Sequence, residues 1–275
     1  MSQADLSLEL LKRKVDELGQ ENTNLKKQIE QVEKDRAEYL QNVSHQLVAP
    51  LNAIKWHIEN LTGGRISVGR AQKVLRSVYS QATIAVHLAK NFNLMSNLEA
   101  DHALKKLKEP LQEINLRGLL VNLANDFQPL AWDREINIVV DEENFDEHPP
   151  VLAMKPLVSQ VFSNIIENAV KYSNEDTKIR IQGRYLPASD CFSVSIQNNG
   201  IPLNPDVCEK IFDRGVRSEE ARRKYPAGTG FGLYIARRII EMHEGKISAS
   251  TCKGHTIFEV TLSVKGLQGK ARLRA

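Results

Sequence analysis

The stretch Asn164-Ile-Ile-Glu-Asn168-Ala-Val-Lys171-Tyr172 decides how the rest of the chain is interpreted. Its asparagines, lysine and tyrosine lie three or four residues apart, which places all four on one face of a helix. Amide oxygens suit a hard cation such as Mg²⁺, and an ammonium group suits phosphate. The stretch therefore predicts a helix that holds a polar ligand. A solvated helix face is the simpler interpretation of any single asparagine, so the other motifs must decide between the two.

The composition of the chain is typical of a soluble globular protein. Its 275 residues are 41% hydrophobic and 26% charged, and the net charge of +3 comes without a dense basic stripe, which argues against a nucleic-acid binder. Three widely separated cysteines, Cys191, Cys208 and Cys252, indicate reduced thiols and no metal cage. No apolar run reaches the ~20 residues of a membrane helix and no signal peptide is recognisable, so we expect a cytoplasmic chain.

The first forty-odd residues have the pattern of a coiled coil. Apolar residues keep a 3–4 spacing between charged flanks, at Leu8, Leu11, Val15, Leu18, Leu25, Ile29, Val32, Tyr39 and Val43. Asn22 and Arg36 fall in the same stripe, and an asparagine there favours a two-stranded, in-register pairing. We interpret the stripe as the seam of a parallel homodimer. A single amphipathic helix lying on a domain is the weaker alternative, because the stripe is narrow.

The same helix is predicted to continue to about Leu61, where Thr62-Gly63-Gly64 ends it. A second helix follows from about Val68 to Leu98. Two long helices with a short connection form an antiparallel hairpin, and two copies of the hairpin would form a four-helix bundle.

From about residue 111 the pattern changes to short β-rich runs. Strands are predicted over 135–140, 178–184, 192–197, 246–250 and 256–264, and helices over 116–128, 156–173 and 230–243. This order predicts an α+β fold, a sandwich with a mostly antiparallel sheet covered on one face by helices. We divide the chain into a coiled coil over 1–33, a hairpin over 34–100, a linker over 101–110, an α/β sandwich over 111–265 and a basic tail over 266–275.

A second motif, Ser44-His45-Gln46-Leu-Val-Ala49-Pro50-Leu51, lies in the first helix of the hairpin. Pro50 would kink the helix one turn after His45, and an uncharged imidazole is a good nucleophile near neutral pH. The other six histidines show no metal-ligand spacing and are expected on the surface: His57, His87, His102, His148, His243 and His255.

A third motif, Gly228-Thr229-Gly230-Phe231-Gly232-Leu233, leads into a helix. Glycines let backbone N–H groups approach phosphate, although such a motif alone is weak evidence and does not match a P-loop. Residues 213–227 before it read as a lid whose charges could meet a triphosphate, at Arg214, Arg217, Arg222, Arg223 and Lys224. A disordered surface loop is equally compatible with this segment when no nucleotide is bound. A fourth motif, Gln197-Asn198-Asn199-Gly200, is by itself an ordinary turn.

Together and in this order, the four motifs resemble the sensor histidine kinases of two-component signalling over roughly residues 34–264. The resemblance implies that His45 is the phosphoacceptor and that Asn168 holds Mg²⁺. It further implies that Lys171 reaches phosphate, and that Ile211-Phe212-Asp213-Arg214 corresponds to the F-box of the family. The ATP-binding residues that it implies are Asn164, Asn168, Lys171, Tyr172, Asn198, Gly200, Arg214, Gly228, Thr229, Gly230, Phe231, Gly232 and Leu233.

The chain also departs from the family pattern. Gln46 stands where the family usually has a carboxylate that takes a proton from the imidazole, and loss of a general base can cost ~10²–10⁴ in rate. Ala49 replaces the polar residue that orients water in phosphatase-competent members. Asn198 replaces the adenine-binding aspartate, and the lost charge should weaken ATP binding by about 1 kcal/mol. Pro202 replaces a second glycine of the family motif and stiffens the turn after Asn198.

We therefore expect a homodimeric histidine kinase that uses ATP and Mg²⁺, with His45 and Gln46 at the reacting centre. The phosphoryl group would pass to an aspartate of a separate response regulator. Two alternatives remain open. One is an ATP-binding scaffold, or pseudokinase, that regulates a partner without phosphotransfer. The other is an ATPase of the related chaperone and topoisomerase group, which is disfavoured because Asn164 stands where those enzymes carry a catalytic glutamate.

Overall fold

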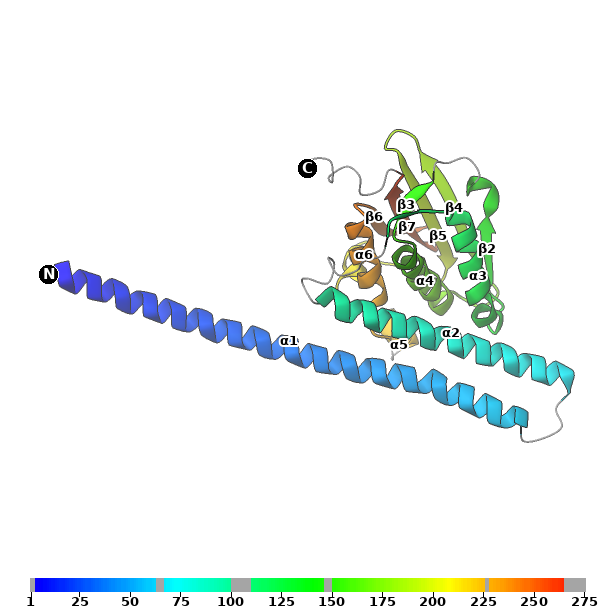
Figure 1. Cartoon of the computed structure of the whole chain (residues 1–275), viewed down its shortest axis with the longest axis horizontal. Coiled ribbons are helices and arrows are strands. Elements are labelled where there is room, and N and C mark those ends of the chain that lie inside the picture. The colour runs from blue at the N-terminus through cyan, green and yellow to red at the C-terminus, as the bar shows by residue number, and fades with distance from the viewer. Residues whose placement is uncertain (1–2, 63–66, 100–109, 146–149, 226–227, 265–275) are drawn as a thin grey trace. The chain divides into compact units, whose positions relative to one another are not determined.

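A computed structural model describes residues 3–62, 67–99, 110–145, 150–225 and 228–264 (Figure 1). The expected linker over 101–110 and the basic tail over 266–275 lie almost wholly outside these ranges. The chain divides into two compact units, one up to His45 and one from Gln46 onward. Within the described residues, no helix is both long enough and apolar enough to cross a membrane.

The helical part consists of two helices with the extents expected from the sequence. Helix α1 covers Gln3–Thr62 and α2 covers Val68–Glu99. The stripe residues Val15, Leu18, Leu25, Ile29 and Val32 are each more than half exposed in the single chain. An exposed row of large apolar side chains is what a coiled-coil seam presents before it is paired.

The sandwich is built on a five-stranded sheet with the order β2-β4-β5-β7-β6. Only the β2–β4 pair is parallel, so the sheet is mostly antiparallel, as predicted. Its strands are β2 (Asn137–Asp141), β4 (Lys178–Leu186), β5 (Cys191–Asn199), β6 (Lys246–Cys252) and β7 (His255–Ser263). A separate pair joins β1 (Gln112–Ile114) to β3 (Val151–Ala153), and neither of these strands was expected from the sequence.

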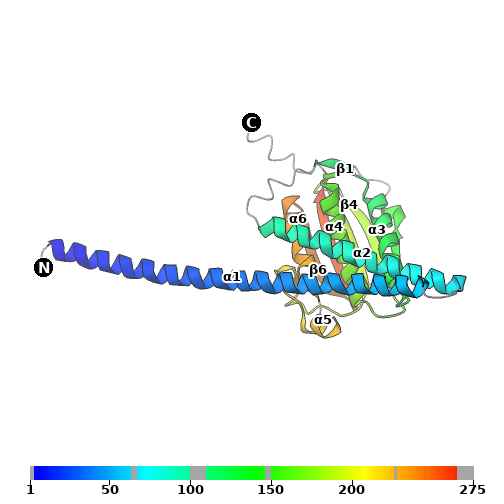
Figure 2. The ribbon, with the colours of Figure 1, turned by 60° about the horizontal axis from the view of Figure 1, so that its bottom comes forward.

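Three helices cover one face of the sheet, as Figures 1 and 2 show: α3 (Leu116–Trp132), α4 (Lys155–Tyr172) and α6 (Gly232–Met242). Asn115 caps α3 by accepting a hydrogen bond from the Gly118 N–H at 2.9 Å, and Pro156 favours the first turn of α4. Residues of α4 such as Phe162 and Ile165 are fully buried, and the helix packs on β5 of the sheet and against its neighbours α3 and α6. The core thus fixes the helix that carries the asparagines.

Three short elements were also missed by the sequence patterns. They are the 3₁₀ helices η1 (Glu142–Phe145) and η2 (Lys210–Phe212) and the helix α5 (Glu219–Lys224). Helix α5 lies within the segment interpreted as a lid. A helix of six residues is too short to display a 3.6-residue period, so only its capping residue Ser218 could have indicated it.

The expectation that all six remaining histidines lie on the surface was wrong for two of them. His87 is 4% exposed and His243 is 3% exposed, whereas His57 and His255 are half-buried. His102 and His148 lie outside the described residues. His243 is buried because the backbone satisfies both ring nitrogens: Nδ1 lies 2.7 Å from the Ile239 carbonyl oxygen, and Nε2 accepts from the Met154 N–H at 3.1 Å.

Candidate functional site

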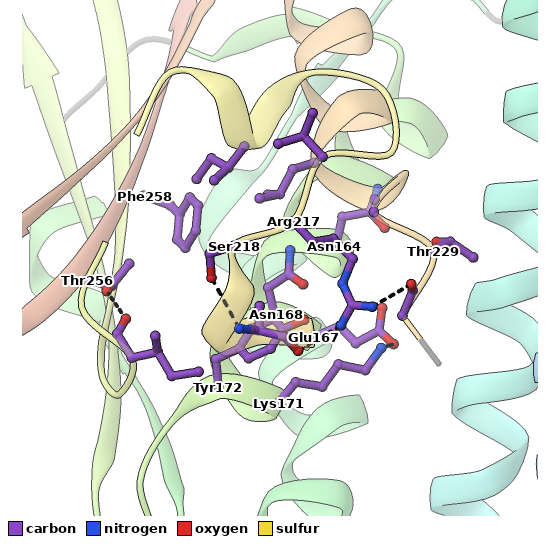
Figure 3. A pocket seen from close by; sticks show the side chains of 18 of the residues that line it. Asn164, Glu167, Asn168, Lys171, Tyr172, Arg217, Ser218, Thr229, Thr256 and Phe258 are labelled. Atoms are coloured by element: carbon purple, nitrogen blue, oxygen red, sulfur yellow. Dashed lines mark hydrogen bonds and ion pairs between the residues drawn. The ribbon is translucent and has the colours of Figure 1, made fainter. Parts of the chain in front are cut away.

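A cavity of about 120 Å³ lies where α4, the glycine-rich turn, the lid and the end of β5 meet (Figure 3). It brings together most of the residues expected to bind nucleotide. Those that line it are Asn164, Asn168, Lys171, Tyr172, Asn198, Gly228, Thr229, Gly230, Gly232 and Leu233. Residues that lie more than 60 positions apart in the sequence therefore share one pocket.

Asn164 carries an unsatisfied polar atom in this pocket. Its side chain is 1% exposed, and its Oδ1 accepts a hydrogen bond from Asn91 Nδ2 at 2.8 Å. Its Nδ2 has no hydrogen-bond partner among the described residues. A buried amide N–H₂ is costly to leave unpaired. An acceptor-rich ligand such as a phosphate would satisfy it, so the residue fits a nucleotide.

Lys171 is held by a carboxylate from its own helix. Its Nζ lies 2.6 Å from Glu167 Oε1, and Glu167 Oε2 lies 2.7 Å from His87 Nδ1. Burial opposes the charge on Lys171, but the Glu167 carboxylate outweighs burial and raises the pKa of the ammonium. Burial would likewise raise the pKa of Glu167, but Lys171 and His87 together hold it well below its usual range. Both groups of the pair are charged.

The opposite end of the pocket is mostly apolar. Ile201, Leu203, Ile211 and Phe258 line it, and Asn198 is the buried amide among them. Asn198 Nδ2 also lacks a hydrogen-bond partner within the described part of the chain. An apolar slot with one free amide suits a flat heteroaromatic ring such as adenine.

Gly200 supports this end without lining it. A Cβ at this position would lie 2.1 Å from the Tyr172 carbonyl oxygen, so only glycine lets β5 approach the end of α4 this closely. The Ile201 N–H donates to the same oxygen at 3.2 Å. The role of Gly200 is therefore backbone packing.

Arg217 joins the lid to the glycine-rich turn. Its guanidinium donates to the carbonyl oxygens of Gly228 and Ala221, each at 2.8 Å, and also to that of Tyr225. Arg217 lines the pocket (Figure 3), although the sequence singled it out only as one of five lid cations. Its position between the F-box and the glycines was the available signal.

The lid also closes against the end of α4. The rings of Tyr225 and Tyr172 meet edge to face at 5.7 Å, and Lys224 Nζ donates to the Ser173 carbonyl at 3.0 Å. Burial and the neighbouring Arg134 lower the pKa of Lys224. These contacts hold α5 near Tyr172.

Besides Gly200, two further residues expected to bind nucleotide lie outside the cavity lining, and these two contact each other. The Arg214 guanidinium lies over the Phe231 ring, 5.7 Å from its centroid. Beside them Gly230 has a φ of +74°, and a Cβ there would lie 2.8 Å from the Gly215 carbonyl carbon. The two ends of the lid thus meet at its base.

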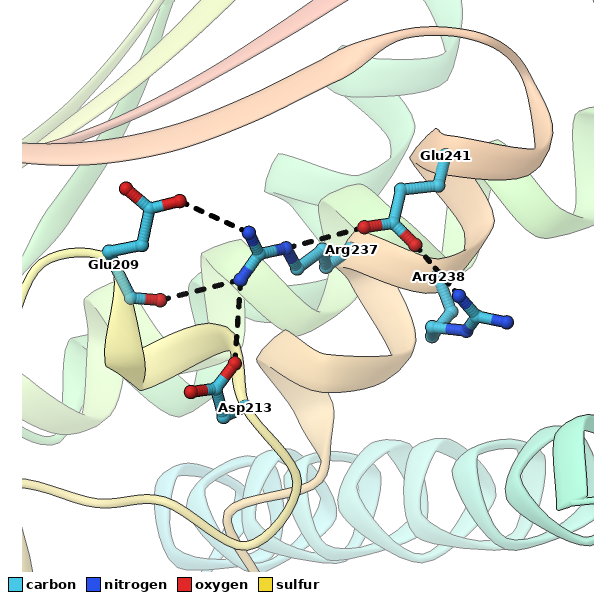
Figure 4. Close-up of polar contacts among 5 residues, drawn as sticks. All are labelled: Glu209, Asp213, Arg237, Arg238 and Glu241. Atoms are coloured by element: carbon cyan, nitrogen blue, oxygen red, sulfur yellow. Dashed lines mark hydrogen bonds and ion pairs between the residues drawn. The ribbon is translucent and has the colours of Figure 1, made fainter.

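A second set of contacts at the lid base centres on Arg237 of α6 (Figure 4). Its guanidinium pairs with Glu209 at 3.2 Å, Asp213 at 3.5 Å and Glu241 at 3.4 Å. It also lies 5.8 Å from the centroid of Phe212, the aromatic residue of the F-box motif. Arg237 thereby ties the start of the lid to the helix that follows its end.

The two residues expected at the reacting centre fall in different units. His45 is exposed and ends the first unit, where the neighbouring Ser44 Oγ donates to the Leu40 carbonyl at 2.8 Å. Gln46 begins the second unit, and its side chain lines the pocket.

Known proteins match both the sequence and the fold. Residues 154–266 match the family described as histidine kinase-, DNA gyrase B-, and HSP90-like ATPase. The sensor protein kinase WalK of Staphylococcus saprophyticus subsp. saprophyticus is 30% identical over 87% of this chain, and WalK of Staphylococcus aureus is 30% identical over 82%. The chain spans only 38% and 52% of those two proteins.

Among solved structures, the Acinetobacter baumannii histidine kinase AdeS is similar in fold. It superposes with a TM-score of 0.51 over 80% of this chain and 98% of its own, at 18% identity. This likeness concerns the fold alone. The sequence matches, together with the asparagine helix and the glycine-rich turn that line one pocket, place the chain in the sensor histidine kinase family, with an ATP-binding domain of the type shared with DNA gyrase B and HSP90.

Proposed function

We propose that the chain is an ATP-dependent protein-histidine kinase that phosphorylates its own His45 and passes the phosphoryl group to an aspartate of a separate response regulator. The observation that supports this best is that two buried amide nitrogens of the pocket have no hydrogen-bond partner among the described residues: Asn164 Nδ2 at the polar end and Asn198 Nδ2 at the apolar end. A ligand with phosphates at one end and an adenine at the other would pair both.

The remaining pocket residues divide the binding of ATP between them. Asn198 would pair with the adenine through both ends of its amide, with Oδ1 accepting from the exocyclic amine and Nδ2 donating to a ring nitrogen. Lys171 would meet the phosphates with N–H groups not directed at Glu167. The backbone of the turn at Gly228–Gly232 precedes α6, whose N-terminus favours negative charge. Asn168 would hold Mg²⁺, which when bound neutralises charge on the phosphate oxygens.

In the proposed reaction a ring nitrogen of His45 donates its lone pair to the γ-phosphorus. The new N–P bond forms as the bond to the bridging oxygen breaks, and ADP leaves with that electron pair. Catalysis of such a transfer rests on positioning and charge neutralisation. The proton on the second ring nitrogen goes to water, because the Gln46 amide can orient the ring but cannot take a proton. The phosphoryl group then passes from nitrogen to a carboxylate oxygen of the regulator.

We further propose that the active form is a homodimer, assembled through the coiled coil and the doubled hairpin, and that it works in the cytoplasm. Ala49 offers no group that could orient water for hydrolysis of a phosphorylated regulator. The phosphatase activity toward the partner is therefore expected to be weak.

The test is incubation with γ-labelled ATP and Mg²⁺, beside the variants His45→Ala and Asn168→Ala. Acid-labile label that His45→Ala abolishes would support the kinase and would show that Gln46 does not block the chemistry. The neutral Gln46 amide in the pocket favours the second candidate, an ATP-binding scaffold. That candidate is supported if no label forms while nucleotide still binds in an Asn168-dependent way.

A further inference from the structure

Helix α2 of the hairpin contributes directly to the nucleotide pocket. Leu88 and Asn91 line the pocket, and His87 lies on the same side of the helix, one turn before Asn91. Both polar residues contact α4: the buried His87 meets Glu167, and the half-buried Asn91 meets Asn164. Neither contact belongs to the family motifs that identified the site.

The His87 contact is buried and closely surrounded. The imidazole is 4% exposed and Glu167 is 6% exposed. Apart from its 2.7 Å contact with Glu167, the ring of His87 packs edge to face on Phe127 at 5.8 Å between centroids. An apolar wall of this kind strengthens the electrostatic attraction between an N–H and a carboxylate.

Glu167 is shared between two donors, and this sharing is what matters for phosphate. One carboxylate oxygen faces Lys171 and the other faces His87. If His87 no longer held Oε2, both oxygens would be free to take N–H groups from the same ammonium. Lys171 would then have fewer donors for a ligand, since an ammonium has only three.

We propose that His87 is a positioning residue for Lys171: by holding one oxygen of Glu167, helix α2 sets where the lysine ammonium stands in the nucleotide pocket. This inference rests on the proposed function, because it takes Lys171 to be the phosphate ligand. Its consequence is a direct link between the hairpin and ATP. A movement of α2 that withdraws His87 changes how the pocket holds the phosphates.

Asn91 supports the same link between α2 and the pocket through Asn164 of α4. Its Nδ2 donates to Asn164 Oδ1 at 2.8 Å, and its Oδ1 accepts from Gln160 Nε2 at 2.9 Å. The Asn91 amide thus fixes the orientation of the Asn164 amide, so that Nδ2 is the atom left for a ligand. His87 and Asn91 of α2 thus orient the N–H groups that Lys171 and Asn164 of α4 direct into the pocket.

The test compares His87→Leu, which fills the space without a polar group, with His87→Gln, which retains a donor for Glu167. Lys90→Ala, an exposed change less than one turn away, is the control. Binding of ATP and of ADP is measured by calorimetry with Mg²⁺, together with KM and kcat for autophosphorylation and the melting temperature. We expect His87→Leu to weaken ATP about tenfold, the value of one hydrogen bond to a charged group. ADP binding should change less, and His87→Gln should restore most of the ATP affinity.

A purely structural histidine predicts a different pattern. In that case leucine would be tolerated better than glutamine, and ATP and ADP would weaken together, either of which overturns the inference. A double-mutant cycle provides the second measurement: in a Glu167→Gln background, His87→Leu should no longer change ATP affinity, since the carboxylate it acts through is gone. If His87→Leu does not fold, His87→Asn, whose shorter amide cannot reach Glu167, takes its place.

The outcomes separate this inference from the proposed function. If the unmodified chain binds neither nucleotide, the proposed function fails and the inference falls with it. If the chain binds ATP and labels His45 but His87→Leu behaves like Lys90→Ala, the kinase stands and the inference alone is wrong.

Discussion

At the scale of single residues, Asn198 is the clearest place where this chain differs from its family. We expect Asn198→Asp to tighten ATP about fivefold, because a charged acceptor binds an adenine amine more strongly than a neutral one. The same change should lower the melting temperature of the ligand-free chain, since position 198 is 2% exposed and a buried, unpaired carboxylate is costly. Calorimetry and thermal unfolding measure the two effects. Asn199→Asp, one residue further and outside the pocket lining, is the control, and weaker ATP binding by Asn198→Asp would contradict the adenine assignment.

His243 gives the second prediction at this scale, and it concerns pH. Burial lowers the pKa of His243 below its ordinary value near 6.5, despite the opposing hydrogen bond with the Ile239 carbonyl. Well above pH 6.5 the ring is neutral in both the folded and the unfolded chain. As the pH falls below 6.5, the unfolded chain takes up a proton that the folded chain resists, so the free energy of unfolding decreases.

His243→Gln should therefore lose less stability than the unmodified chain between pH 7.5 and pH 5.5. Glutamine can still accept from the Met154 N–H, but it does not titrate. Urea unfolding at several pH values measures the slope, with His255→Gln as the control. An unchanged slope in His243→Gln would show that other groups cause the pH dependence.

The two buried histidines also show what could be predicted from single residues. The asparagines and Lys171 of α4 could be assigned to one face because helical periodicity is a local property of the sequence. The partner of His87 lies 80 positions away on another helix, and no period within either helix specifies that pairing. Helix spacing therefore predicted which residues of α4 share the pocket, but not the residues of α2 that contact them.

At the scale of elements, the base of the lid depends on Arg237. Each of its ion pairs is partly exposed and worth little alone, but three carboxylates converge on one guanidinium (Figure 4). The Phe212 ring lies beside the same group. We expect Arg237→Ala to leave the sheet intact and to release η2 from α6. Backbone amides over residues 209–218 should then exchange hydrogen about fivefold faster, for a loss of roughly 1 kcal/mol of local stability.

Hydrogen exchange followed by mass spectrometry measures this effect, and ATP affinity should fall with it. Arg238→Ala is a matched control, because Arg238 pairs with Glu241 on its own helix at 2.9 Å. Raised salt should weaken the difference between the two variants, since partly exposed ion pairs are screened. Equal exchange in both variants would mean that the contacts of Arg237 do not hold the lid.

At the scale of the whole molecule, the sequence predicted the kind and order of the main elements because each displays its own period over many residues. The long helices α1 and α2 and the mostly antiparallel sheet all agree with those periods. The short pieces β1, β3, η1, η2 and α5 do not, because three to six residues cannot establish a period. Packing against longer elements stabilises them, and that information is spread over the chain.

The last prediction concerns the assembly of two chains. Leu18 and Leu25 lie seven residues apart in the α1 stripe, and each is more than half exposed in the single chain. If the stripe is a dimer seam, placing glutamates at both positions removes four leucines from the interface, and each buried leucine stabilises it by about 1.5–3 kcal/mol. The dissociation constant of the dimer should rise at least about 100-fold for Leu18→Glu/Leu25→Glu, even if the hairpin bundle still holds the chains together.

Sedimentation equilibrium measures this dissociation constant, with Lys26→Glu/Lys27→Glu as a control that adds acidic residues beside the stripe. Because the doubled hairpin is proposed as the active form, autophosphorylation should become dependent on protein concentration and recover at high concentration. A double-leucine variant that stays dimeric at nanomolar concentration would show that the stripe is not the seam.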